Sequence, residues 1–346
     1  MQKIAAFLLS FLTISAFAIT STNNLQNPEV LEYAKAVSQK HKIPLKQVES
    51  ILLQANYDPK VINSINHPYE EKPWDTYRKL FITQQRITQG LAYLHQHEAL
   101  LNKLQNQYGV PASVIVAIVG VETNYGEHIG DFSALDALYT LGFYYPSRQS
   151  FFRHQLTELI LLSRQDNMSL DELRGSYAGA LGIPQFMPDT YRQYAVDYDK
   201  NAKVDLLRNH DDALASIANF LNKKGWKSGN NIADQFRSKH VNPTWISDKA
   251  IPTRSITEWK KLGVWPENSN FDQDRAAVIA LNCSDKQKPE YWLTYPNFRV
   301  IMSYNPRIAY AMAVFQLSQE IDRAYGRELA AKNTRTSSAK STHGSA

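Results

Sequence analysis

The chain has 346 residues, which predicts two or three domains at about 100 to 200 residues each. Hydrophobic residues make up 43% and charged residues 21%, as in ordinary globular proteins, and 14 Gly with 15 Pro exclude a collagen-like or low-complexity chain. The net charge of +5 favours acidic partners, but the Lys and Arg residues are scattered and no Arg-rich helix occurs, which argues against nucleic acid.

The first 18 residues have the layout of a secretory signal peptide. Lys3 supplies a short positive start, an apolar run covers 4–17, and small residues suit cleavage after Ala18. The run is shorter than the roughly 20 residues of a spanning helix, so we expect no transmembrane segment in the mature chain. Cys283 is the single cysteine, so no internal disulfide can form and no thiol follows the run for lipid attachment. These features predict an exported, soluble protein.

Most of the remaining chain has helical periodicity. Apolar residues recur every three or four positions over 28–40, 44–55, 83–106, 111–125, 149–166, 187–194, 210–225 and 307–327. Short runs rich in β-branched and aromatic residues predict strands over 275–282, 290–295 and 298–304. The tail over 328–346 lacks apolar periodicity and is predicted to be disordered. A mostly helical protein with a small antiparallel β unit before the last helix is expected.

Glu122 is the candidate general acid. It lies in the last turn of the predicted helix 111–125, which is apolar on all sides and therefore buried, and Gly126 is the expected cap. Burial and the negative end of the helix dipole both disfavour the ionised carboxylate, so a raised pKa is predicted. A carboxyl that stays protonated can donate a proton to a leaving oxygen. The alternative at this stage is a carboxylate that ends the helix and pairs with an arginine.

A second candidate is the segment over 174–188, RGSYAGALGIPQFMP. Its three glycines and two prolines predict a tight loop that approaches another part of the chain closely. Ser176 and Gln185 offer polar groups, while Phe186 and Met187 offer apolar faces, a combination that suits sugars. The alternative is a turn that only lets two helices pack closely. No Lys-Ser or Lys-Thr pair follows the glycines, so this is not a phosphate loop.

Several motifs together resemble one known family. GVETNYG, DALYTLGFYYPSR, GSYAGALGIPQFMP, YAVDYDKNAKVD and YWLTYPNFRVIMSYNPRIAYAMAVFQLSQEI occur in the order found in the membrane-bound lytic murein transglycosylase B family, glycoside hydrolase family 103. The resemblance covers about Tyr77 to Ile321. It implies a periplasmic enzyme that cleaves peptidoglycan glycan strands without water, forming 1,6-anhydromuramyl ends, with possible partners in cell-wall complexes and no cofactor for catalysis.

The resemblance also assigns site residues. Glu122 matches the family's single acid/base, so the second carboxylate of ordinary glycosidases is not needed. Family residues that contact substrate match a further set: Tyr77, Arg148, Ser176, Gln185, Phe186, Met187, Phe220, Tyr304, Asn305 and Tyr310. Two positions depart from the family. Ser147 stands where a second arginine often precedes Arg148, and Phe220 replaces a tyrosine, which removes a hydroxyl.

An acidic loop resembles part of an EF-hand. Asp197, Asp199, Asn201 and Asp205 occupy positions 1, 3, 5 and 9, with the Lys203 carbonyl between them. Ala202 stands where glycine is usual and Arg208 where the bidentate acid belongs, so Asp212, or Asp211 beside it, would close a longer loop as in the family. A structural calcium ion and a solvated acidic loop both remain open.

The predicted fold is α+β and predominantly helical: a lysozyme-like catalytic core with a helical subdomain and a small inserted antiparallel β subdomain. The predicted parts are a signal peptide over 1–18, a helical region over 19–110, the core over 111–226, a β subdomain over 227–303, a returning helix over 304–327 and the tail over 328–346. Two other functions remain open: an inactive murein-binding scaffold, or a hydrolytic muramidase with Asp131 as its second carboxylate.

Overall fold

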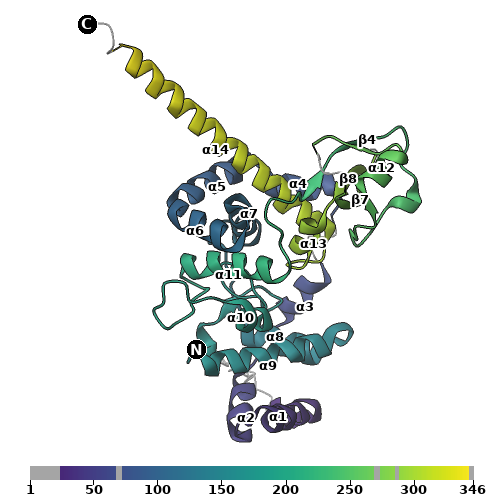
Figure 1. Ribbon diagram of the computed structural model, residues 1–346. Coiled ribbons are helices and arrows are strands. Elements are labelled where there is room, and N and C mark those ends of the chain that lie inside the picture. Colours follow the sequence, from purple (N-terminus) through teal and green to yellow (C-terminus); the bar gives the residue numbers. More distant parts are fainter. Residues whose placement is uncertain (1–23, 68–71, 269–272, 285–287, 343–346) are drawn as a thin grey trace, which may run out of the picture. The chain divides into compact units, whose positions relative to one another are not determined.

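The structure is a computed structural model that describes residues 24–67, 72–268, 273–284 and 288–342 (Figure 1). The predicted signal peptide over 1–18 lies outside the described residues. Contacts divide the chain into two compact units with the boundary after Ala55. The predicted helical region over 19–110 is therefore shared between two units, and its larger part belongs to the unit that contains the predicted core.

The described part of the first unit is a short 3-10 helix, η1 (Asn24–Gln26), followed by two α-helices. Helix α1 (Pro28–His41) begins after Asn27, whose side chain accepts a hydrogen bond from the Glu29 amide, and it ends at Lys42 with a left-handed φ of 57°. Helix α2 (Leu45–Gln54) follows. The apolar faces of the two helices are buried through Val30, Ala34, Val37, Val48 and Leu52. Both helices were predicted from periodicity and both are confirmed.

The second unit contains the remaining described helices. They are α3 (Pro59–Asn66), α4 (Trp74–Phe81), α5 (Gln84–Gln96), α6 (Glu98–Tyr108), α7 (Ala112–Thr123), α8 (Ala134–Tyr144), α9 (Gln149–Gln165), α10 (Pro188–Tyr194), α11 (His210–Lys223), α12 (Ile256–Lys261), α13 (Pro296–Met302) and α14 (Ile308–Thr342). Helix α7 lies between α5, α6 and α11 in Figure 1 and also contacts α14. Because its residues from Ser113 to Gly120 are all buried, α7 is the central helix that the sequence predicts.

The strands are short and antiparallel. They are β1 (Phe132–Ser133), β2 (Arg174–Gly175), β3 (Ala233–Asp234), β4 (Phe236–Arg237), β5 (Arg254–Ser255), β6 (Trp265–Pro266), β7 (Arg275–Leu281) and β8 (Glu290–Thr294). The largest sheet has the order β3-β8-β7-β5, while β1 pairs with β2 and β4 with β6. Around Trp259 of α12, a buried cluster forms the core of this β region, with Ile256, Val264, Ala276, Val278, Leu293 and Tyr295.

Three predictions about elements are wrong. The single helix over 83–106 is two helices, because His97 leaves the helical conformation (φ −111°, ψ 17°) and its ring packs on Tyr93 and His210. The strand over 298–304 is instead part of α13. Pro296 occupies the first turn of that helix, and Phe298 and Ile301, three positions apart, share its buried side.

The third error concerns the tail. The described residues 328–342 continue α14 as helix, whereas the tail was predicted to have no regular structure. Gly326 does not end the helix, and Glu328, two residues later, bonds through its Oε2 to His95 Nε2 of α5 at 2.8 Å. No Gly or Pro follows until Gly344, so nothing in this stretch interrupts helical hydrogen bonding.

Among the described residues, none of the helices alone is both long and apolar enough to cross a membrane. One bent pair, α6 with α7, meets the length and composition test together, at an angle of 112°. Helix α7 is buried inside the second unit, as a core helix would be.

Candidate active site

Glu122 is half-buried in the last turn of α7, and neighbouring loops fix that turn. The helix ends at Asn124, whose left-handed φ is 51° and whose amide donates to the Val119 carbonyl, so Asn124 is the cap in place of the predicted Gly126. The Thr123 hydroxyl donates to the Ile183 carbonyl at 3.0 Å. This bond ties the Glu122 turn directly to the glycine-rich loop.

The other side of the same turn is held by Tyr125 and Arg86, which the sequence analysis did not single out. The Tyr125 hydroxyl donates to the Arg86 carbonyl at 2.7 Å, and the Arg86 guanidinium donates to the Gly120 carbonyl. A Cβ on Gly120 would lie 2.8 Å from the Tyr125 ring. Glycine at 120 therefore allows Tyr125 to pack against α7 two residues before Glu122.

Tyr310 of α14 is a hydrogen-bond partner of Glu122. Its hydroxyl donates to Glu122 Oε1 at 2.6 Å. Burial, together with the nearby Glu122 charge, raises the pKa of Tyr310 well above its usual value. Tyr310 consequently remains a neutral donor over the whole physiological range. The family resemblance gave Tyr310 only as a substrate-contacting residue, so its direct bond to the acid is a finding of the structure.

Tyr304 stacks beside Tyr310. Their ring centroids are 6.3 Å apart with an interplanar angle of 14°, and the Tyr304 hydroxyl donates to the Pro184 carbonyl. Burial, and to a smaller extent Glu122, also raises the pKa of Tyr304 well above its usual value. Tyr304 thus connects the loop before α14 to the glycine-rich loop, and Asn305 is the next residue in that connection.

The glycine-rich loop is held by its own polar side chains. Ser176 Oγ accepts from the amides of Ala178 and Ala180 at 3.3 and 3.1 Å. Gln185 Nε2 donates to the carbonyls of Ile129 and Gly182, each at 2.9 Å. The predicted close approach occurs at Gly182, where a Cβ would lie 2.2 Å from the Leu206 carbonyl oxygen.

Aromatic residues from three elements form a small pocket beside this loop. The Phe186 ring lies 5.7 Å from Phe220 of α11 and 5.6 Å from Tyr304. The pocket has a volume of about 60 Å³ and is lined by Gln185, Phe186, Met187, Thr190, Phe220, Ser303 and Tyr304. Five of the predicted site residues therefore meet here. Tyr194, whose ring packs edge-on against Phe220 at 5.1 Å, was not predicted.

The remaining predicted residues have different surroundings. Tyr77 of α4 is buried, packs against Phe81 at 4.9 Å and is near enough to Tyr310 to contribute to the raised pKa of that residue. Arg148 is exposed, and its guanidinium lies 4.4 Å from the centre of the Phe151 ring. None of its described contacts joins it to Glu122. Glu127, the next carboxylate after Glu122 in the sequence, is exposed and accepts a hydrogen bond from the side-chain amide of Asn124.

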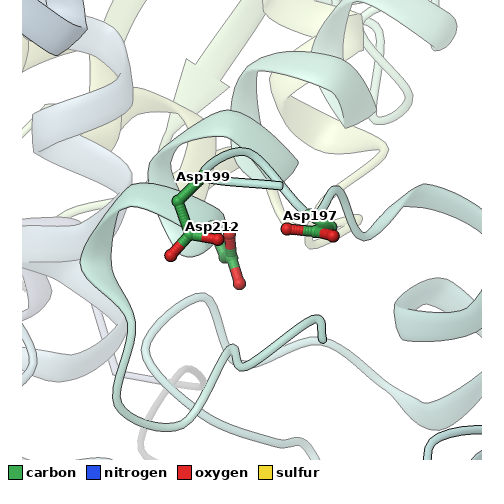
Figure 2. A group of neighbouring side chains, drawn as sticks. All are labelled: Asp197, Asp199 and Asp212. Carbon is green, nitrogen blue, oxygen red and sulfur yellow. The ribbon is translucent and has the colours of Figure 1, made fainter. Parts of the chain in front are cut away.

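The acidic loop brings three carboxylates together (Figure 2). One oxygen each of Asp197, Asp199 and Asp212 lies within 4.8 Å of the others. Calcium ligands at 2.3 to 2.6 Å from the ion can be up to about 5 Å apart, so one ion could contact all three. Burial, with the nearby charges of Asp199 and Asp197, raises the pKa of Asp212. This hard oxygen set fits a calcium ion.

The other predicted metal ligands are engaged within the loop. Asn201 Oδ1 accepts from the Lys203 amide at 2.9 Å, and Asp205 Oδ1 accepts from the Leu207 amide at 3.0 Å. Ala202, at the position where glycine is usual, adopts a left-handed φ of 68°. The loop therefore makes the sharp turn without glycine, and of the two residues proposed to close a longer loop, Asp212 is the one that lies beside Asp197 and Asp199.

Comparisons with known proteins agree with these observations. The sequence model of one protein family, the transglycosylase SLT domain, matches residues 26–319. The chain is 33% identical over 306 residues to membrane-bound lytic murein transglycosylase B of Escherichia coli (strain K12), covering 85% of this chain and 83% of that protein. The chain belongs to the transglycosylase SLT domain family. The predicted resemblance is confirmed.

Solved structures give the same result. The soluble lytic transglycosylase SltB1 from Pseudomonas aeruginosa superposes with a TM-score of 0.80 at 36% identity, over 86% of this chain and 100% of that one. The Escherichia coli lytic transglycosylase Slt35 in complex with calcium has a TM-score of 0.78 at 33% identity. The match covers 87% of this chain and 95% of that one. Pseudomonas aeruginosa SltB3 in complex with NAG-anhNAM-pentapeptide has a TM-score of 0.74 at 30% identity. The match covers 85% of this chain and 79% of that one.

The family establishes the class of function. The chain is an enzyme, a lytic murein transglycosylase acting on peptidoglycan, and its predominantly helical fold with small antiparallel sheets is lysozyme-like. These conclusions confirm the predicted fold class and the predicted enzyme class. The alternative of an inactive scaffold is not supported.

Proposed function

We propose that Glu122 is the single acid/base of a cleavage that uses no water. Its protonated carboxyl donates to the glycosidic oxygen between N-acetylmuramic acid and N-acetylglucosamine, and the C1–O bond breaks. The carboxylate then removes the proton of the muramyl C6 hydroxyl as O6 bonds to C1. The proton returns to Glu122, and the product has a 1,6-anhydro ring.

The observation that carries this proposal is the setting of Glu122. The carboxyl is fixed by a neutral Tyr310 donor at 2.6 Å, on a helix end that loops hold from two sides. Tyr304 is close enough to Glu122 for the carboxylate charge to raise the pKa of the tyrosine, and its ring packs against Phe186 and Phe220. The relative SltB3 binds NAG-anhNAM-pentapeptide, which contains an anhydro sugar of the kind this reaction forms.

Analysis of the products tests the mechanism. Digestion of purified murein should yield anhydro ends, which are lighter than hydrolytic ends by one water and are detected by mass spectrometry. Glu122→Gln, which keeps the shape but removes the titratable proton, should lower turnover by at least about 10²-fold. Glu127→Gln is the matched control, because Glu127 is exposed, and it should retain activity. Reducing muramyl ends would instead establish a hydrolase.

We also propose that Asp197, Asp199 and Asp212 hold a structural calcium ion. The three convergent carboxylates support this, as does the calcium complex of the relative Slt35. A bound ion would neutralise the charge gathered in the loop between α10 and α11, and catalysis would not use it. The predicted roles of Arg148 in contacting substrate and of 1–18 in export to the periplasm stay predictions. N-terminal sequencing of the periplasmic protein tests the latter.

A further inference from the structure

The β region carries an open groove that is separate from Glu122. It has a volume of about 640 Å³, and among the residues lining it are Arg237, Lys239, His240, Trp245, Leu262 and Trp265. None of these residues belongs to the pocket beside the glycine-rich loop. Figure 1 shows β4 and α12, which flank the groove, apart from α7. The groove is therefore a second surface of the second unit.

The groove exposes large apolar side chains. Trp265 of β6 is 54% exposed, and Leu262, just after α12, is 42% exposed. Tryptophan is rarely left this open, because burying its ring stabilises a fold strongly. Adjacent exposed apolar side chains in a groove indicate a surface that another molecule covers.

Positive charge surrounds the exposed ring. The strand register places Arg237 of β4 directly opposite Trp265 of β6, so their side chains lie on the same face. Lys239 and His240 follow in the next loop and also line the groove, and none of the described lining residues is acidic. The groove thus combines a flat ring with cations, which suits a partner that is both ring-shaped and anionic.

Contacts within the β region hold one wall and one loop of the groove. Trp245 packs edge-on against the buried Trp259 at 5.8 Å, which anchors one wall to the core of the β region. The Ser238 hydroxyl donates to the His240 carbonyl at 2.8 Å and braces the loop that carries Lys239. Little conformational entropy would be lost on binding, because these walls are already ordered.

We propose that this groove binds a second stretch of murein glycan, away from the bond being cleaved. Trp265 would stack on a sugar ring, while Arg237 and Lys239 would pair with the carboxylates that muramic acid and its peptides carry. The inference rests on the proposed function, since it takes the same polymer as substrate. The groove would hold the enzyme on an insoluble wall between successive cleavages.

Pelleting with insoluble polymers tests this proposal. In a Glu122→Gln background, which binds without cleaving, Trp265→Ala should weaken binding to murein about fivefold to tenfold. Arg237→Ala should weaken murein binding and make it less sensitive to salt. With chitin, a neutral polymer of N-acetylglucosamine, Trp265→Ala should still weaken binding, whereas Arg237→Ala should not.

Matched controls keep the result interpretable. Tyr57→Ala removes an aromatic ring that is 49% exposed outside the groove, and Lys103→Ala removes an exposed cation of α6; both should bind murein like the parent. Thermal unfolding of each variant separates lost binding from lost folding. Unchanged murein binding by folded Trp265→Ala and Arg237→Ala would overturn the proposal. So would concentration-dependent self-association that Trp265→Ala abolishes, since that assigns the face to a second copy of the chain.

The two proposals can fail separately. If the wild-type chain forms no anhydro ends on murein, the mechanism fails, whatever the binding results. If anhydro ends form but the groove variants pellet with murein as the parent does, only the groove inference fails.

Discussion

The hydrogen bond from Tyr310 to Glu122 should change the pKa of the Glu122 carboxyl in a direction that can be predicted. The neutral hydroxyl at 2.6 Å stabilises the carboxylate more than the carboxylic acid, so this bond opposes the rise in the pKa of Glu122 that burial is predicted to cause. Tyr310→Phe removes the donor, and the pKa of Glu122 should rise. Because the first step needs the protonated carboxyl, the alkaline limb of the pH–activity profile should move to higher pH. A hydrogen bond contributes about 1.5 to 3 kcal/mol when its partner is charged and about 0.5 to 1.5 kcal/mol when it is neutral, and the difference corresponds to about one pH unit.

The measurement is kcat/KM for soluble murein fragments from pH 4 to pH 9. Tyr304→Phe is the comparison, because the Tyr304 hydroxyl bonds to the Pro184 carbonyl and not to Glu122. It should alter kcat/KM without moving the alkaline limb by a comparable amount. An unmoved limb in Tyr310→Phe would mean that the hydrogen bond does not control the proton affinity of Glu122.

Local sequence could indicate Glu122 but not its surroundings. An apolar helix with one acid in its last turn is visible within a dozen residues. The Tyr310 contact joins positions 188 residues apart, and the family resemblance gave Tyr310 only as a substrate-contacting residue. Arg86 and Tyr125 were missed for the same reason. An arginine in an amphipathic helix is ordinarily solvated, and only the folded chain shows that its guanidinium reaches the Gly120 carbonyl.

The end of α7 is the element on which the site depends, and Gly120 tests it. Gly120→Ala would place a Cβ 2.8 Å from the Tyr125 ring, which cannot move freely because its hydroxyl is bonded to Arg86. We expect a loss of about 1 to 3 kcal/mol in the free energy of unfolding, as for an overpacked core. Turnover should also fall, because the Glu122 turn is displaced. Urea unfolding and kcat, measured at a temperature where both proteins are folded, check the two effects.

Gly326 supplies a control within another helix. It lies inside α14, and a Cβ there would meet no described heavy atom within 4 Å. Gly326→Ala should therefore be neutral or stabilise the chain by up to about 1 kcal/mol, because alanine favours helix more than glycine does. Equal effects of the two substitutions would show that the Tyr125 contact is not tight.

Elements were predictable where periodicity was long and local. Helices α1, α2, α7, α9 and α11 agree closely with their predicted ranges. The short run at 298–304 was misread, because β-branched residues in so short a segment fit a buried helix or a strand equally well. The break at His97 was also invisible, since it depends on a ring contact with His210, far along the chain.

At the scale of the whole molecule, the proposed calcium ion in the acidic loop would stabilise the second unit, which contains Glu122. The loop leads into α11, which packs against α7 and carries Phe220 beside Tyr304. The single cysteine leaves no internal disulfide to constrain the chain. Ion binding would therefore stabilise not only the loop but also the packing behind the site.

Calcium should raise the thermal midpoint of the wild-type chain, because an ion that binds only the folded state stabilises that state. At a free concentration 100 times Kd the gain is about 2.7 kcal/mol. Asp212→Asn should remove most of the gain, since Asp212 is buried and closes the carboxylate group. Asp211→Asn is the matched control in the same helix turn; its side chain is 49% exposed and lies outside the group. Scanning calorimetry with calcium and with chelator distinguishes them. If the wild-type midpoint is the same in both, the loop holds no calcium, and α11 is stabilised by the capping bonds from Asn209 without an ion.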